Sequence, residues 1–234
     1  MIRKELRIVS IVILLAGGFL LAKDFWEKPY TEWKKADVNK MLGDSPWAKT
    51  QTTAEQVGGK GSGVGGDKEI YNNVVIRFFS ALPVRQAYVR TMQLMNNYDS
   101  KSESEKAEID AKFGRILKID FSKMIIVALE YSTNDQERRM NVKRYLENTK
   151  VEQLKQSCYL ISDRLGRIEL QEYYPPSPDG TGAKFVFPRM VGDKPAVTAE
   201  DKEVKFDLYL SPVNQRVFLT FKINSMMHGG ELAI

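Results

Sequence analysis

The sequence predicts an α+β protein in which an N-terminal membrane anchor or signal helix precedes a curved antiparallel sheet, a partial barrel, with two or three helices. An uncharged apolar run occupies residues 8–22 directly after a basic segment, which is typical of export signals and membrane anchors. Helical hydrophobic periodicity then dominates up to about residue 150, and strict alternation dominates the remainder. Consecutive strands joined by short turns favour antiparallel pairing.

The N-terminal 30 residues are predicted to be a signal anchor with an aromatic interfacial segment. As a helix, residues 8–22 span roughly 22 Å, short of the roughly 30 Å hydrocarbon core, so a cleaved signal peptide and a retained anchor both stay open. Phe25, Trp26 and Tyr30 resemble the aromatic belt at a membrane interface and favour the anchor. We expect a single-pass protein of the bacterial inner membrane with its main domain in the periplasm, or an exported protein after cleavage.

Residues 31–49 predict a short membrane-proximal helix. Thr31 is a suitable N-cap, and Gly43 followed by Pro46 is typical of a helix end. Because so short a helix is marginal in water, Trp33 and Trp47 are expected to hold it against a larger body or the membrane face.

The stretch VGGKGSGVGG, residues 57–66, contains the G-x-G-x-x-G spacing of a dinucleotide-binding loop. Such a loop follows a buried strand and begins a helix, whose N-terminus binds the pyrophosphate. Here a polar segment precedes the glycines and a strand-like segment, DKEIYNNVVIRFF, follows them. The order is inverted, so we predict a Gly-rich linker at residues 50–68, or a long hairpin tip, without phosphate binding.

Residues 69–234 are predicted to form the α+β domain. Pro83 marks the first turn of one amphipathic helix, Ser102 and Glu105 form a capping box for a second, and residues 134–150 suggest a third. The apolar run 123–132 predicts a central, covered strand. Further strands are expected at 74–79, 157–162, 166–174, 183–187, 204–210 and 216–223, with a short final strand within 226–234.

Residue types that carry catalysis are scarce. The chain has one histidine, His228, and one cysteine, Cys158, too few for a zinc site or for a Ser-His-Asp triad with a recognisable nucleophile motif. Cys158 lies in an apolar strand and is expected to be a small buried residue. The formal net charge is +5, but three positive charges precede the apolar run, so the body is nearly balanced and nucleic acid is not an expected partner. We predict no catalytic residues, cofactor or metal.

The loop EYYPPSPDGTG offers the most individual contact surface. Tyr173 and Tyr174 before the prolines resemble a rigid aromatic platform for a peptide or glycan. Together with Trp33 and Trp47 they are the candidate binding residues.

Two stretches resemble a group of uncharacterised exported proteins of Acidobacteria-like bacteria. In that group a Trp-containing helix leads into Ser-Pro-Trp, and an aliphatic strand leads into Ser-Ala-x-Pro-x-Arg. The residues that match are Trp33, Leu42, Ser45, Pro46 and Trp47, then Arg77, Ser80, Ala81, Pro83 and Arg85. The resemblance implies export and a similar domain, with no activity attached.

These features favour a membrane-anchored periplasmic or cell-surface binding module without catalysis, with the membrane and envelope proteins or an apolar ligand as partners. One alternative is an apolar-ligand carrier or sensor whose sheet encloses a cavity lined by Phe206, Leu208, Leu219 and Phe221. Another is a hydrolase in which two carboxylates meet across a cleft, with candidates Glu130, Glu169, Glu172 and Asp207.

Overall fold

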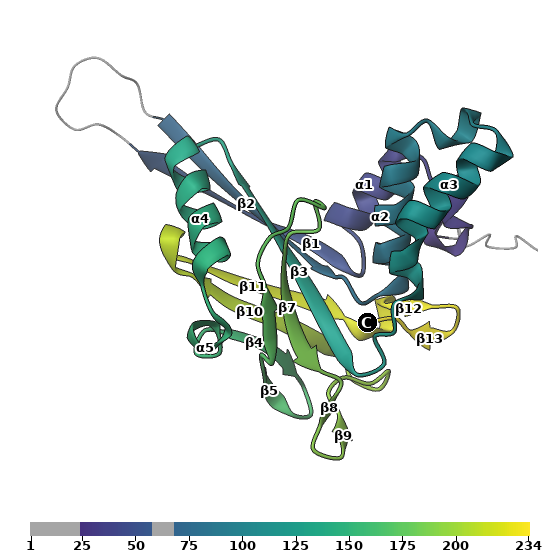
Figure 1. Cartoon of the computed structure of the whole chain (residues 1–234). Helices are drawn as coiled ribbons and strands as arrows, with labels where there is room; N and C mark the ends of the chain where they lie inside the picture. The colour runs from purple at the N-terminus through teal and green to yellow at the C-terminus, as the bar shows by residue number, and fades with distance from the viewer. Residues whose placement is uncertain (1–23, 58–67) are drawn as a thin grey trace, which may run out of the picture.

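The computed structural model describes residues 24–57 and 68–234 (Figure 1). The predicted anchor at 8–22 and the glycine-rich stretch 58–67 lie outside these residues. Among the helices that the structure does describe, none has the length and apolar content needed to cross a bilayer. The described residues form a mixed α+β structure with antiparallel sheets.

The main sheet contains five antiparallel strands in the order β1-β2-β3-β7-β6. Its third strand along this order, β3, holds the apolar run predicted as central, and Ile125 to Leu129 are buried within it. The strand bounds are β1 (Ala48–Val57), β2 (Lys68–Phe78), β3 (Met124–Thr133), β6 (Glu172–Tyr174) and β7 (Ala183–Pro188).

A second sheet contains four antiparallel strands in the order β11-β10-β4-β5. Alternation in β10 places Val204, Phe206 and Leu208 in the interior, because successive side chains of a strand point to opposite faces. The strand bounds are β4 (Cys158–Ser162), β5 (Gly166–Glu169), β10 (Glu203–Leu210) and β11 (Gln215–Lys222), and two small hairpins pair β8 (Met190–Val191) with β9 (Lys194–Pro195) and β12 (Met227–His228) with β13 (Glu231–Leu232).

The two large sheets share one aromatic core. Phe78 of the first sheet contacts Phe221 of the second with ring centroids 4.9 Å apart, and Phe185 contacts Phe206 at 5.6 Å. At one edge the chain passes directly from β5 into β6 and so joins the sheets. At the other edge the Gln51 amide donates to the Arg216 carbonyl at 2.8 Å and accepts from the Phe218 amide at 3.1 Å. These described strands curve around the core but do not form a closed barrel.

Three helices gather at one end of the sheets (Figure 1), and a fourth lies against β3. Near the first group Trp33 and Trp47 are completely covered, with exposures of 1% and 0%. The helix bounds are α1 (Lys35–Gly43), α2 (Leu82–Met95), α3 (Glu103–Phe113), α4 (Gln136–Asn148) and α5 (Val151–Leu154), and the short 3₁₀ turns are η1 (Phe25–Glu27), η2 (Tyr30–Glu32), η3 (Tyr98–Ser100), η4 (Gly114–Lys118), η5 (Ser211–Val213) and η6 (Ile223–Ser225).

The structure corrects the predicted domain boundaries. Residues 50–57, assigned to a linker, belong to β1 and pair with β2 from Ala48 opposite Arg77 to Val57 opposite Lys68. The short helix α1 packs on α2 and on β1, so it belongs to the same body as residues 69–234. The strand was missed because β1 is an edge strand whose outer half is exposed on both faces, where polar residues are favoured over apolar alternation.

The helices and sheets also differ in number from the expectation. We expected one curved sheet with two or three helices beyond the membrane-proximal one, whereas the described residues form two large sheets and five α-helices in all. α5 is a single turn of four residues, too short for hydrophobic periodicity to reveal.

Candidate functional site

A pocket of about 350 Å³ lies between the start of α2, the segment before β3, the end of β7 and the β12–β13 hairpin. We call it the cationic pocket because two arginines line it. Its lining residues are Ser80, Leu82, Arg85, Ile119, Asp120, Phe121, Ser122, Arg189, His228, Glu231, Leu232, Ala233 and Ile234.

Arg85 projects from the first turns of α2 and is buried, with 8% exposure. Its Nη1 donates to the carbonyls of Ile116 and Leu117, each at 3.0 Å, and its guanidinium lies over the Phe121 ring at 4.7 Å. Its Nε is buried without a hydrogen-bond partner. A buried donor without an acceptor is costly and uncommon.

Arg189 enters the same pocket from the residue that follows β7. Its Nε donates to the Phe121 carbonyl at 2.7 Å, and its Nη2 donates to the main-chain oxygen of Ile234, the last residue of the sequence. Burial lowers the pKa of both Arg85 and Arg189, with nearby Asp120 acting in the opposite sense on Arg189. No Asp or Glu side chain forms an ion pair with either guanidinium in the part of the chain that the structure describes.

The β12–β13 hairpin brings His228 to the pocket. Its turn uses Gly229 and Gly230 at φ values of 62° and 86°, a conformation that glycine adopts without strain. The hairpin is held by Trp47, whose Nε1 donates to the Ala233 carbonyl at 2.6 Å and whose ring meets the imidazole edge-on at 6.4 Å. His228 Nδ1 is buried and has no hydrogen-bond partner.

Two carboxylates also line the pocket, and both belong to exposed residues. Asp120 accepts hydrogen bonds from the backbone amide and Oγ of Ser122 at 2.8 and 2.9 Å, which lower its pKa. Glu231 lies at the exposed end of the hairpin. Water screens such exposed charges more than buried ones, so the interior of the pocket is cationic and its mouth is acidic.

A larger hollow of about 480 Å³ adjoins the cationic pocket. We call it the apolar groove; it lies between α2, the α3–η4 segment and the loop before β7. Ile119 lines both hollows. The groove is lined by Tyr88, Val89, Met92, Lys112, Phe113, Arg115, Ile116, Ile119, Pro178, Asp179 and Thr181.

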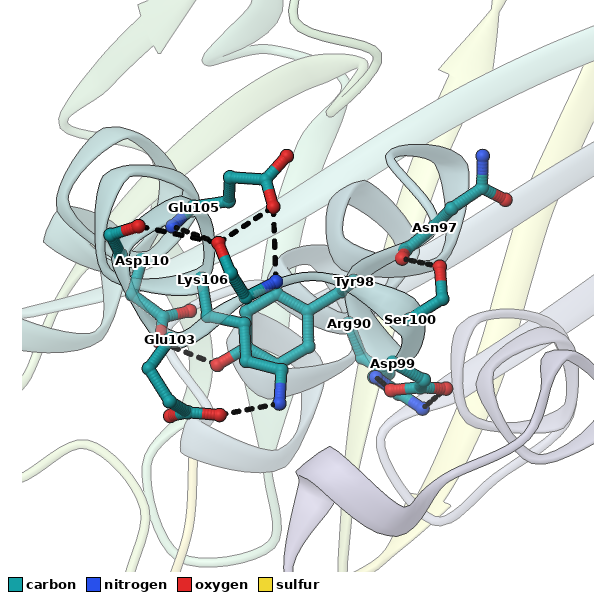
Figure 2. Close-up of polar contacts among 11 residues, drawn as sticks. Arg90, Asn97, Tyr98, Asp99, Ser100, Glu103, Glu105, Lys106 and Asp110 are labelled. Atoms are coloured by element: carbon teal, nitrogen blue, oxygen red, sulfur yellow. Dashed lines mark hydrogen bonds and ion pairs between the residues drawn. The ribbon is translucent and has the colours of Figure 1, made fainter.

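A polar network fixes the helices that form this groove. Arg90 of α2 donates both Nη atoms to the Asp99 carboxylate at 2.8 Å, as Figure 2 shows, and donates Nε to the Trp33 carbonyl at 2.8 Å. On α3, Asp110 accepts from Gln93 at 2.8 Å and from the Tyr98 hydroxyl at 2.7 Å. The bond to Asp110 raises the pKa of Tyr98 to about 12. α3, which buries no residue of its own, is therefore held to α2 chiefly by polar contacts.

The structure places the four predicted binding residues in different environments. Trp33 and Trp47 are core residues and offer no ring surface to a partner. Tyr173 is half-buried on Phe185, with its hydroxyl bonded to the Leu146 carbonyl, and burial raises its pKa. Tyr174 is 50% exposed and donates to Glu172 at 2.6 Å. Of the four residues, only Tyr174 has an openly exposed ring.

The predicted membrane-interface residues pack partly against the core. Phe25 meets Trp33 edge-on at 5.5 Å, and Trp26 meets Trp47 in the same way at 5.7 Å. Tyr30 is also partly buried. The segment is thus tied to the body of the protein, and contact of its exposed atoms with a membrane stays a prediction.

The residues named for the two alternative functions do not assemble as those functions require. Phe206, Leu208 and Phe221 are fully buried among core side chains and line neither hollow described above. The acids are engaged separately: Glu130 binds Arg77 at 2.7 Å, and Asp207 binds Arg216 at 2.8 Å. Glu172 accepts from Tyr174, and Glu169 is an exposed residue of β5 opposite Tyr159.

Cys158 is a buried free thiol whose pKa is raised by burial, which agrees with its expected packing role. Within the described ranges no group of three or more His, Cys, Asp or Glu residues is arranged to hold a metal ion.

Sequence reasoning missed the site that the structure assembles. Arg85 was named only among residues carrying a resemblance, His228 was named only as the single histidine of the chain, and Arg189 was not singled out. The only sequence signal for Arg85 is its position in the first turns of a predicted amphipathic helix, next to the apolar Val84. No comparable local pattern marks Arg189.

Comparisons of the chain with protein-family models, with curated proteins and with solved structures found no match. The functional argument therefore rests on the residues of this chain.

Proposed function

We propose that this chain is a non-catalytic binding module of the bacterial envelope, held at the inner membrane by residues 8–22, whose cationic pocket takes the carboxylate of a ligand. One observation carries the ligand assignment: two guanidiniums, Arg85 and Arg189, line a single pocket, and no Asp or Glu side chain among the residues that the structure describes forms an ion pair with either.

The membrane part of the proposal is supported by the sequence. Basic residues, the apolar run and the aromatic segment follow one another in the order that favours a single-pass anchor with the body in the periplasm. Phe25 contacts the buried Trp33, with ring centroids 5.5 Å apart. The folded body of the protein would therefore begin directly after such an anchor.

A binding experiment can use His228 as its reporter, because the chain contains a single histidine and its imidazole signals in NMR need no assignment among several. The full chain in detergent micelles is titrated with acetate at constant ionic strength, with chloride as the salt control. We expect a saturable change of the imidazole signals that chloride does not cause.

Arg189→Gln is expected to weaken acetate binding by at least about tenfold, the effect of removing one charged hydrogen bond. Arg144→Gln is the matched control, since Arg144 is an exposed arginine of α4 outside the pocket. The proposal fails if acetate and chloride act alike, or if both variants bind acetate as the wild type does.

A further inference from the structure

The main sheet has an open slot beside β3. This strand pairs with β2 as far as Thr133, but its pairing with β7 ends at Leu129, opposite Ala183. The residue before β7 is Gly182, at φ +78°. On the β7 side, residues 130–133 therefore have no strand partner within the part of the chain that the structure describes. Burial changes at the same point: residues 125–129 are buried, whereas residues 130–133 alternate between exposed and half-buried.

The register shows which main-chain groups lie at this open edge. The Arg189 amide donates to the Lys123 carbonyl at 3.2 Å, in line with the β3–β7 ladder. In an antiparallel pair every second residue directs its N–H and C=O groups to the same neighbour. Counting from Lys123, Tyr131 and Thr133 direct their N–H and C=O groups to the slot, so an extended segment placed there would find a ready ladder.

A pocket of about 210 Å³ lies at the slot, and we call it the edge pocket. It is lined by Leu129 and Tyr131 of β3 and by Val142 and Leu146 of α4. The two α4 residues are 0% and 4% exposed, so the surface they offer is apolar. Its volume is below the roughly 300–1,000 Å³ of small-molecule sites. The edge pocket therefore suits one apolar side chain better than a whole ligand.

A segment added at the slot would direct one side chain into the edge pocket. A residue opposite Tyr131 has its side chain on the same face of the sheet as Tyr131, which is the face that meets α4 at the pocket. The next residue of such a segment, opposite Glu130, would point to the other face. Glu130 binds Arg77 at 2.7 Å there, so the acid of the slot is already neutralised.

Two cations of α4 add a charge preference. Arg139 and Lys143 lie one helical turn apart, are exposed, and line the edge pocket. Arg139 has no ion-pair partner among the described residues, and Lys143 lies 3.8 Å from Glu147. Because α4 begins three residues after β3 ends, Arg139 belongs to the end of the slot near Thr133. A carboxylate on the residue opposite Thr133 would therefore be attracted to Arg139.

We propose that the slot binds an extended peptide of a partner protein by strand addition, antiparallel to β3. An aliphatic side chain occupies the edge pocket, and an acidic side chain two residues earlier lies at Arg139. In this mode main-chain hydrogen bonds give affinity, and pockets for alternate side chains give specificity. The inference goes beyond the proposed function and does not depend on it, since the edge pocket and the cationic pocket share no lining residue.

Fluorescence anisotropy tests the main-chain part on the full chain in detergent micelles. The probe is the fluorescein-labelled hexapeptide amide Thr-Glu-Thr-Leu-Thr-Thr, whose leucine is opposite Tyr131 in the proposed register. N-methylation of the leucine removes the N–H that faces β3 and should weaken binding at least about tenfold. N-methylation of the threonine before it is the matched control, because that N–H faces away from β3, and binding should be kept.

Variants of α4 test the charge part. Arg139→Gln should weaken peptide binding about two- to fivefold, the range for one exposed ion pair. Arg144→Gln should leave it unchanged, since Arg144 is an exposed arginine of α4 outside the edge pocket. Arg139→Glu should reverse the preference, so that a hexapeptide with lysine in place of glutamate binds more tightly than the original. Such a reversal cannot result from unfolding.

The outcomes decide the inference. Absence of saturable binding, equal losses from the two N-methylated peptides, or equal effects of Arg139→Gln and Arg144→Gln would overturn it. A dimer in sedimentation that the hexapeptide dissociates would also overturn it, because the occupant would then be a second copy of this chain. Acetate, the probe of the cationic pocket, should not displace the hexapeptide, so a failure at one site leaves the other proposal standing.

Discussion

The loop that forms one wall of the apolar groove depends on Gly182, and replacing this residue with alanine should destabilise the protein strongly. Gly182 precedes β7 at φ +78°, and a Cβ added there would lie 2.2 Å from the Leu129 carbonyl oxygen and 2.9 Å from its carbonyl carbon. Both atoms belong to the backbone of β3, which pairs with β7 at this point, Leu129 opposite Ala183. The strand cannot yield without breaking that pairing.

Gly180 provides the matched control. It has almost the same backbone conformation, φ +73°, but a Cβ added there meets nothing within 4 Å. Both substitutions carry the cost of a left-handed conformation, about 1–2 kcal/mol. Only Gly182→Ala adds steric overlap with backbone, about 1–3 kcal/mol more by analogy with overpacked cores.

Thermal unfolding followed by circular dichroism measures the difference. For a protein of this size 1 kcal/mol corresponds to a shift of about 2–4 °C, so we expect Gly182→Ala to melt about 2–12 °C below Gly180→Ala. Equal melting temperatures for the two variants would refute the reasoning, because they would show that the loop can move away from β3 at no cost.

Two further predictions concern the pH dependence of stability and the location of the protein. Burial alone would raise the pKa of Asp201, but hydrogen bonds from Arg164 and Thr198 outweigh burial and lower the pKa. The lowered pKa stabilises the folded protein above the unfolded pKa of about 3.9. This stability is lost as the pH falls through the folded pKa of Asp201. Acid titration of unfolding should therefore show a weaker loss in Asp201→Asn than in the wild type, and parallel curves would contradict this. In bacterial fractionation the intact chain should pellet with membranes and its body should be cleaved by protease added to spheroplasts; recovery of the intact protein in the cytosol would exclude the proposed anchor.

Local sequence patterns predicted the elements whose neighbours along the chain decide their structure. The capping box is present, with the Ser102 amide donating to Glu105 at 3.0 Å and the Glu105 amide donating to Ser102 Oγ at 3.5 Å. The alternation in 204–210 and 216–223 became the β10–β11 hairpin, with Leu208 opposite Val217. Such signals are reliable because capping and side-chain alternation act over a few residues.

Local sequence patterns gave wrong predictions for residues whose environment is formed by distant parts of the chain. β1 pairs with β2 across the glycine-rich stretch although its outer half is polar, because an edge strand is specified by backbone pairing. Trp33 and Trp47, expected at a contact surface, are buried at 1% and 0% exposure. The residue type alone could not show whether these tryptophans lie at a membrane surface or in the interior beside the helices, since aromatic rings suit both environments.

The sequence by itself determined helices α2, α3 and α4, the β10–β11 hairpin, and the scarcity of histidine and cysteine. Only the tertiary structure decided that Arg85, Arg189 and His228 share a pocket. Arg189 lies 104 positions after Arg85, and His228 lies 39 positions after Arg189. The order of the strands in the sheets and the β12–β13 hairpin bring the three residues together. Local propensities extend over one or two turns of chain, whereas the charge balance of a pocket depends on which distant segments pack against one another.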